Sequence, residues 1–300
     1  MENKQKNPPE ITDPFCSLIG LEVEEVREDG LTTRAKLKKE FCNTYSSAHG
    51  GFVYAVGHTS AVLSAELCLG RHAVVVDASN QYECSLMVSP ARVKTRLIRA
   101  GREIIVYRVQ VRDGKGKLCL SQIITLKEVD YPQAQPREFP QTIVPGNENS
   151  PVDPVTDIYY PRLSVFFSSI CHIYVLGRGE RGMIYGADIY PETSNAYGAA
   201  HGGMIYTCCD SASGGSAAFL LSKKPVTVSS SIHYLRSAME GPVKAEAKLV
   251  RAGKNLLFYD VDITDGNDEL VAIAQFVMQT VEYRVTNELR PEYRKKAFKD

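Results

Sequence analysis

The segment NAYGAAHGG at residues 195–203 runs directly into the apolar stretch MIYTCCD at residues 204–210. A near-copy, NTYSSAHGG, occupies residues 43–51, which is 152 positions earlier (195 minus 43). In both copies a His-Gly-Gly opens a stretch long enough for a buried helix, and an Asn precedes the His by six residues. The copies differ in one respect that matters chemically, because Asp210 in the second is replaced by His58 in the first.

The repeat extends well beyond these motifs. Residues 43–129 align with residues 195–281 without a gap, and 27 of the 87 aligned positions are identical. An offset that stays fixed over such a length indicates a duplication. We therefore predict three regions: a first repeat at 1–130, a proline-rich linker at 131–157 and a second repeat at 158–300.

Each repeat combines one long apolar helix with antiparallel strands. The stretches 51–69 and 203–221 are rich in small and apolar residues and carry no polar stripe, which is typical of a helix buried on most of its faces. Alternating apolar residues and turn motifs predict strands after each helix. The strands are expected at 74–82, 91–99, 103–112 and 118–128, and again at 226–234, 243–251, 255–264 and 270–281.

The segments before the motifs also predict regular structure. A hairpin is expected over residues 21–37, and a helix over 163–176 followed by a hairpin that ends near residue 188. A sheet that wraps around a helix gives an α+β fold in each half. Pairing the free edge of one sheet with that of the other would make one continuous sheet, with both long helices packed against it.

Composition excludes several classes of function. Lys plus Arg and Asp plus Glu both total 35, so no net charge attracts nucleic acid or an anionic membrane. The eight cysteines form no CxxC pair and follow no apolar signal core, which favours reduced thiols and a cytoplasmic location. We expect no membrane span, because no apolar run reaches about 18 residues.

Three features together resemble a known family. They are the Asn…His-Gly-Gly…Asp arrangement, the Tyr-Leu-Arg at 234–236 and the Arg-Ala-Gly-Lys turn at 251–254. The chain resembles the hotdog-fold acyl-CoA thioesterases of the phenylacetate-degradation type, as a tandem double hotdog. Ser237 stands where that family usually has Pro, and the first half lacks both the Tyr-Leu-Arg and the acid. The resemblance implies a thioester hydrolase that uses no metal or cofactor, with coenzyme A as part of the substrate, and a dimer of chains.

Thioester hydrolysis needs an activated water or nucleophile and a positive potential at the carbonyl oxygen. Free N–H groups at the start of a buried helix supply that potential, and glycines let an acyl group approach the backbone. The resemblance implies that the Gly after the His donates to the oxyanion, with Asn assisting and Asp acting across an interface.

Helix geometry supports a site shared between the repeats. Asp210 lies about seven residues into its helix, or on the order of 10 Å from its own helix start, too far to serve a thioester held there. It must serve the start of the other helix. The expected catalytic set is Asp210, Asn43, Gly50, His49 and Thr227. A second composite site, without a carboxylate, combines Asn195, His201, Gly202 and His58 with Val75.

The expected substrate-binding residues are Gly51, which lets the acyl group approach, and basic residues for the phosphates of coenzyme A. Solvated turn charges are an equal alternative for these basic residues. For the site residues, Asp210 alternatively serves as a structural carboxylate, His49 and His201 fix their loops, and His58 is a packed replacement. The basic residues are Arg99, Arg102, Arg236, Arg251 and Lys254.

Two other functions fit the same fold. A non-catalytic acyl-CoA binder would retain the helix starts without turnover. A hotdog enoyl-CoA hydratase would use an acid–His pair to add water to an enoyl group, although no hydratase-like motif accompanies the helix. The acyl group itself is left open by the sequence.

Overall fold

The computed structural model describes residues 13–130, 167–221 and 223–281, so the linker predicted at 131–157 lies outside it. The same order of elements occurs twice, and from the long helix onward each element of the second repeat starts 152 residues after its counterpart. The first repeat consists of α1 (Pro14–Ile19), β1 (Leu21–Arg27), β2 (Gly30–Ala35), η1 (Lys39–Phe41), α2 (Gly50–Leu69), β3 (Ala73–Tyr82), β4 (Ala91–Ala100), β5 (Ile104–Arg112) and β6 (Leu118–Glu128). The second consists of α5 (Phe167–Ile170), β7 (Ile173–Arg178), β8 (Met183–Ala187), η2 (Pro191–Thr193), α6 (Gly202–Leu221), β9 (Pro225–Tyr234), β10 (Val243–Ala252), β11 (Leu256–Thr264) and β12 (Leu270–Thr280).

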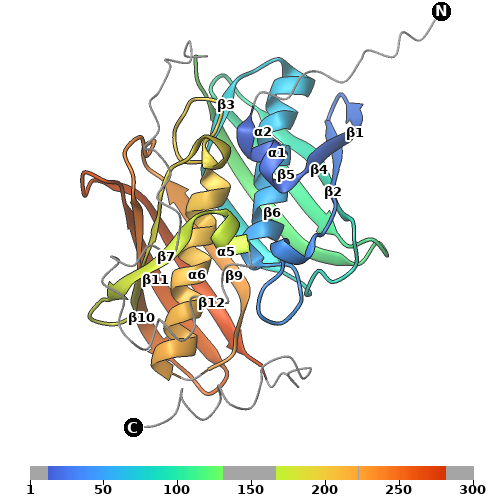
Figure 1. The fold of residues 1–300 in the computed structure, drawn as a ribbon. Coiled ribbons are helices and arrows are strands. Elements are labelled where there is room, and N and C mark those ends of the chain that lie inside the picture. Colours follow the sequence, from blue (N-terminus) through green and yellow to red (C-terminus); the bar gives the residue numbers. More distant parts are fainter. Residues whose placement is uncertain (1–12, 131–166, 222, 282–300) are drawn as a thin grey trace, which may run out of the picture.

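All the strands in the described residues belong to one 12-stranded sheet, in the order β1-β2-β4-β5-β6-β3-β9-β12-β11-β10-β8-β7. At its centre β3 pairs with β9 in antiparallel fashion, and Ser79 lies opposite Ser231. Because these two serines are themselves 152 residues apart (231 minus 79), a pseudo-twofold axis passes between them. Figure 1 shows the two halves, blue to green and yellow to red, related in this way. The prediction that the sheet edges join is confirmed.

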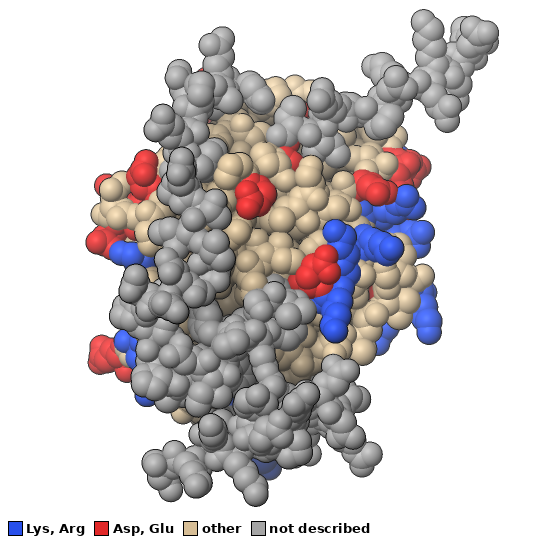
Figure 2. Space-filling view, in the orientation of Figure 1, with Lys and Arg blue, Asp and Glu red and all other residues tan. Residues whose placement is uncertain are grey.

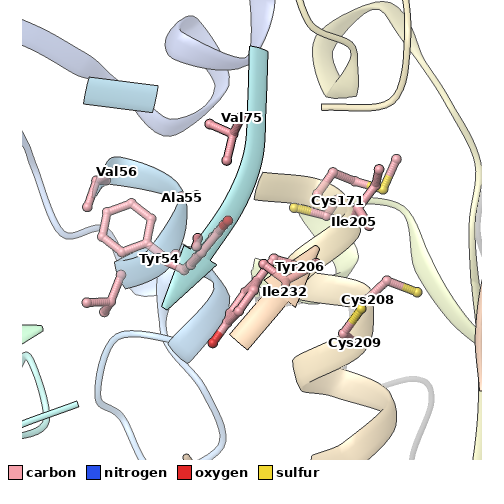
Figure 3. Close-up of a cluster of buried hydrophobic side chains, with 14 of the residues drawn as sticks. Tyr54, Ala55, Val56, Val75, Cys171, Ile205, Tyr206, Cys208, Cys209 and Ile232 are labelled. Carbon is pink, nitrogen blue, oxygen red and sulfur yellow. The ribbon is translucent and has the colours of Figure 1, made fainter. Parts of the chain in front are cut away.

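The two long helices lie on the same face of this sheet and contact each other near their starts (Figure 1). A Cβ placed on Gly51 would clash with the Thr207 side chain, so a larger residue at position 51 would push the helices apart. The Tyr54 and Tyr206 rings stack across the axis with centroids 3.7 Å apart and planes 7° from parallel. Figure 3 shows these rings within the buried cluster between the helices. This contact fixes the start of each helix relative to the other.

The short opening helix of each repeat covers the motif of the other repeat. Phe15 of α1 stacks on the ring of His201, with centroids 4.0 Å apart and planes 9° from parallel. Phe167 of α5 packs edge-on against Phe52 of α2, with centroids 5.5 Å apart. Each motif is therefore enclosed by residues from both halves of the chain.

The helix predicted over residues 163–176 is wrong where the structure describes that segment. Helix α5 ends at Ile170, and β7 already begins at Ile173. Between them His172 adopts a left-handed conformation, with φ of 53°, which ends the helix. The alternating Ile-Tyr-Val sequence that follows suits a strand.

Helix α2 is long and apolar enough to cross a membrane by length and composition, contrary to the expectation from the sequence. Within the fold, however, 72% of its 18-residue apolar window is buried, so the core of the protein accounts for its composition.

On the surface, Lys and Arg gather at the right-hand side of the first repeat beside acidic side chains (Figure 2). Between β2 and β1, Arg34 pairs with Glu22 at 2.8 Å.

Candidate active site

The loop before each long helix is held by its asparagine. Asn43 Oδ1 accepts hydrogen bonds from the backbone N–H of Tyr45 at 2.9 Å and of Ser47 at 3.3 Å. Asn195 Oδ1 does the same for Tyr197 at 2.9 Å and Ala199 at 3.1 Å. These are local Asx-type turns, in which the amide oxygen binds backbone N–H groups two and four residues further on. They form in both repeats, although the residue facing the helix start differs between the two sites. Among the described residues, no hydrogen bond joins Asn43 to Asp210.

Each histidine of the motif caps its helix. His49 Nδ1 accepts from the Gly51 N–H at 3.0 Å, and His201 Nδ1 accepts from the Gly203 N–H at 2.9 Å. A backbone N–H can only donate, so the proton of the neutral His49 ring sits on Nε2, which lies 3.2 Å from Ser168 Oγ. Burial lowers the pKa of His49 and favours this neutral form, although the nearby Asp210 carboxylate opposes the shift.

Asp210 of α6 lies against the start of α2. Its Oδ2 would be 2.7 Å from a Cβ placed on Gly50, and it is 3.4 Å from His49 Nδ1. The other carboxylate oxygen, Oδ1, accepts a hydrogen bond of 2.6 Å from Thr227 Oγ1 at the beginning of β9. Only 8% of Asp210 is exposed. One oxygen is therefore anchored, while the other faces the glycine at which α2 begins.

The Gly50 N–H is available to a ligand. The first N–H groups of an α-helix have no partner within the helix. His49 takes the Gly51 N–H, and no group within the described residues accepts from the Gly50 N–H. A helix start carries partial positive charge, here within reach of a buried carboxylate. This arrangement brings together four residues of the expected catalytic set, namely His49, Gly50, Asp210 and Thr227.

Behind the helix start runs a chain of buried hydroxyl groups that the sequence analysis missed. Tyr82 donates to the Gly50 carbonyl at 2.9 Å and lies 2.9 Å from the hydroxyl of Tyr206. Tyr206 in turn bonds Ser230 Oγ at 2.6 Å, and Ser230 bonds the Asn80 amide at 3.1 Å. Tyr82 and Tyr206 could have been found from the repeat, because each has a tyrosine at the matching position of the other half, Tyr234 and Tyr54. Nothing in the sequence indicated Ser168.

The second composite site also forms, but with different chemistry. The His58 ring of α2 lies at Gly202, close enough for its Nε2 to clash with a Cβ placed there. Tyr234 donates to the Gly202 carbonyl at 2.7 Å, as Tyr82 does in the first site. Val75 matches Thr227 of the first site, and His58 matches Asp210. The second site therefore lacks the hydroxyl and the carboxylate at these two positions. Burial, with a contribution from His201, holds the pKa of His58 well below its usual value and keeps the ring neutral.

The expected substrate-binding cations divide between the two sites. The turn with Arg251 and Lys254 leads into β11 at Leu256, which pairs with Gln279 of β12. Gln279 pairs in turn with Val226 of β9, the neighbour of Thr227. That turn therefore lies on the side of the first site. By the same pairing, the turn with Arg99 and Arg102 lies on the side of the second. Arg236 lines the cavity of the second site and pairs with Glu269.

Comparison with known proteins agrees with this fold and its duplication. A family model described as the thioesterase superfamily matches residues 45–120 and 197–272, once in each repeat and over half of the chain in total. A Haemophilus influenzae protein named "Putative esterase" is 24% identical over 116 residues, which cover 38% of this chain and 84% of that protein. A Saccharolobus solfataricus protein of the same description is 36% identical over 92 residues, covering 30% of this chain and 59% of that protein.

Solved structures share the whole tandem arrangement. An acyl-CoA thioesterase II from Mycobacterium marinum has a TM-score of 0.60 at 14% identity, covering 91% of this chain and 100% of that chain. A protein with a hot dog fold from Alicyclobacillus acidocaldarius has a TM-score of 0.63 at 12% identity, covering 90% of this chain and 98% of that chain. At such identities these likenesses establish the fold, and the predicted double hotdog is confirmed.

Proposed function

The chain belongs to the thioesterase superfamily, and we propose that it hydrolyses acyl-CoA thioesters where the start of α2 meets Asp210. The observation that carries this proposal is the position of Asp210 Oδ2 beside Gly50, with Oδ1 held by Thr227. An acyl-CoA substrate is also what the Mycobacterium marinum enzyme is named for. The Arg251–Lys254 turn on the same side offers positive charge for the phosphates of coenzyme A.

The chemistry follows from this geometry. The thioester carbonyl oxygen accepts a hydrogen bond from the Gly50 N–H, and the helix start stabilises the negative charge that develops on it. Asp210 Oδ2 takes a proton from a water molecule as that water attacks the carbonyl carbon. The tetrahedral intermediate then collapses, the C–S bond breaks, and the leaving thiolate takes the proton from Asp210. The products are a free acid and coenzyme A.

The tautomer of His49 favours hydrolysis over enoyl hydration. A hydratase of the kind considered above needs a histidine that shares a proton with the acid. His49 Nδ1, the ring nitrogen that faces Asp210 at 3.4 Å, already accepts from the Gly51 N–H and has no proton to give. In this assignment His49 positions the helix start, and Asp210 alone moves the proton.

The proposed function is tested on the full chain with a panel of straight-chain acyl-CoA thioesters, phenylacetyl-CoA and crotonyl-CoA. We expect loss of the thioester absorbance and formation of coenzyme A and the free acid, identified by chromatography. Because all eight cysteines are free thiols, an absorbance readout is preferable to a thiol reagent. Conversion of crotonyl-CoA to a hydroxyacyl-CoA would support a hydratase instead, and binding without turnover of any thioester would support a non-catalytic binder.

The Thr227 hydroxyl should contribute to turnover by orienting Asp210. We expect Thr227→Val to lower kcat roughly 10-fold, because a hydrogen bond to a charged group is worth about 1.5–3 kcal/mol and 1.4 kcal/mol corresponds to a factor of ten. Valine is the residue that the first repeat carries at the matching position, Val75, so the substitution should fold. Thr227→Ser should retain the parental rate. A parental kcat in Thr227→Val would show that the hydroxyl does not orient the base.

A further inference from the structure

A cavity of about 310 Å³ opens at the second composite site, which has no carboxylate at the position equivalent to Asp210. Residues of both repeats line it, among them His58 of α2 and Gly202 at the start of α6. Its apolar wall includes Val62, Val75 and Ile205. The volume and composition suit a small apolar group next to a polar attachment point.

Two polar groups of this cavity, one on His58 and one on Gly202, have no hydrogen-bond partner within the described residues. His58 is only 5% exposed, and its Nδ1 has no hydrogen-bond partner within the described residues. Its Nε2 points at Gly202, where α6 begins. A buried polar atom without a partner is unfavourable, so packing alone is a poor reason for a histidine at this position. Gly202 N–H is likewise without an acceptor among the described residues, because His201 takes the next N–H along.

The charges select the kind of ligand. A 20-residue helix presents its positive end to the cavity, and the neutral imidazole beside it places no negative charge there. Arg236 stands at the edge of the same cavity, and the turn that holds Arg99 and Arg102 lies on the same side. Two acidic residues, Asp13 and Glu66, also line the cavity, and Asp13 Oδ2 lies 3.5 Å from His201 Nε2. A ligand with a carbonyl oxygen, a short apolar group and distal phosphates matches the helix start, the apolar wall and the basic residues.

We propose that the second site binds an intact acyl-CoA thioester without hydrolysing it. The carbonyl oxygen lies at the Gly202 N–H and the acyl group lies against Val62 and Val75. Hydrolysis is absent because His58 and Val75 stand where the first site has Asp210 and Thr227, and the Asp13 carboxylate that lines the cavity faces His201 Nε2 at 3.5 Å. This inference rests on the proposed function for the class of ligand, and it assigns each chain one hydrolytic and one binding site.

The test measures binding stoichiometry with a probe that cannot be hydrolysed. In S-(2-oxohexyl)-coenzyme A a methylene group separates the sulfur from a ketone, which keeps the carbonyl oxygen. Titration calorimetry on the Asp210→Asn chain should detect two binding events per chain. Gly202→Val should remove one of them, because any Cβ at position 202 clashes with His58, and the matched Gly50→Val should remove the other. Arg236→Glu, at a side chain that is 54% exposed and so safe for folding, should weaken the second-site event about 10-fold.

Each outcome decides between the two proposals. A single event that survives Gly202→Val and disappears in Gly50→Val would overturn the second site and leave the proposed function standing. A single event lost only in Gly202→Val would support the second site and contradict the assignment of the first. Hydrolysis by Asp210→Asn that Gly202→Val abolishes would show that the second site is itself catalytic. No binding at millimolar probe would overturn both.

Discussion

Asp210→Asn is expected to lower kcat for acyl-CoA hydrolysis by about 10²–10⁴-fold, the usual effect of losing a general base. Asparagine keeps the shape of the side chain, and its amide oxygen can still accept from Thr227 at the position of Oδ1. The substitution removes the negative charge beside Gly50 and little else. Because the neighbouring His49 ring is held neutral by burial, no cation loses its partner. The free energy of unfolding should therefore stay close to the parental value.

The control for this variant is another buried carboxylate outside the site. Asp265 is 6% exposed and its Oδ1 accepts from the backbone of Asn267 and Glu269 in the β11–β12 turn. Asp265→Asn should leave kcat unchanged, which shows that removing a buried charge is not itself harmful. Both variants are compared by steady-state kinetics and by chemical denaturation. An Asp210→Asn enzyme with parental kcat would remove Asp210 from the mechanism.

Much of the fold was predictable because the chain contains its own comparison. The helix expected over 51–69 forms as Gly50–Leu69, and the absence of a polar stripe correctly indicated burial. The strands of the second repeat follow at the same offset as those of the first. What the repeat could not provide was the register at the seam between β3 and β9. That register depends on contacts between residues 148 (229 minus 81) to 156 (233 minus 77) positions apart, and sequence alternation fixes only which side chains share a face.

The failed helix prediction could have been avoided from the same repeat. Position 172 corresponds to Gly20 of the first repeat, which ends α1 in a left-handed conformation with φ of 62°. His172 takes that conformation without being a glycine, so the usual composition signal for a helix end is missing. The apolar residues after it were therefore attributed to a longer helix, whereas their alternation belongs to β7.

The candidate site was predictable in part. Helix arithmetic placed Asp210 beyond reach of its own helix start, and the structure places it at the other one. The partners of Asn43 were not predictable, because its oxygen is engaged by local loop geometry that the motif does not state. The position of Arg236 in the second cavity was not predictable either. It depends on which of the two sites the end of β9 reaches, and the sequence does not state this. The prediction that Asn43 assists catalysis stays a prediction.

The second site lacks the two groups on which the mechanism relies for proton transfer, the carboxylate and the hydroxyl, and supplying both should move hydrolysis there. We expect Asp210→Asn, combined with His58→Asp and Val75→Thr, to hydrolyse acyl-CoA at least about 10-fold faster than Asp210→Asn alone. The substitutions give the second site the carboxylate and hydroxyl of the first, on equivalent elements. Tyr234 already holds the Gly202 carbonyl there as Tyr82 holds that of Gly50, and the cavity for the acyl group is present.

The recovered activity must come from the second site, and one further substitution establishes this. Adding Gly202→Val should abolish it, whereas adding Gly50→Val should not, the reverse of what is expected in the parental chain. Because a new buried carboxylate can destabilise the protein, each variant is first checked for cooperative unfolding and for binding of the ketone probe. A folded triple variant that binds the probe and shows no recovery would mean that a carboxylate facing a helix start is insufficient. The proposed mechanism would then lack a group that only the first site possesses. The first candidate is the hydrogen-bonded chain Tyr206–Ser230–Asn80, because the second site has Ala78 in place of Ser230 and Ile232 in place of Asn80.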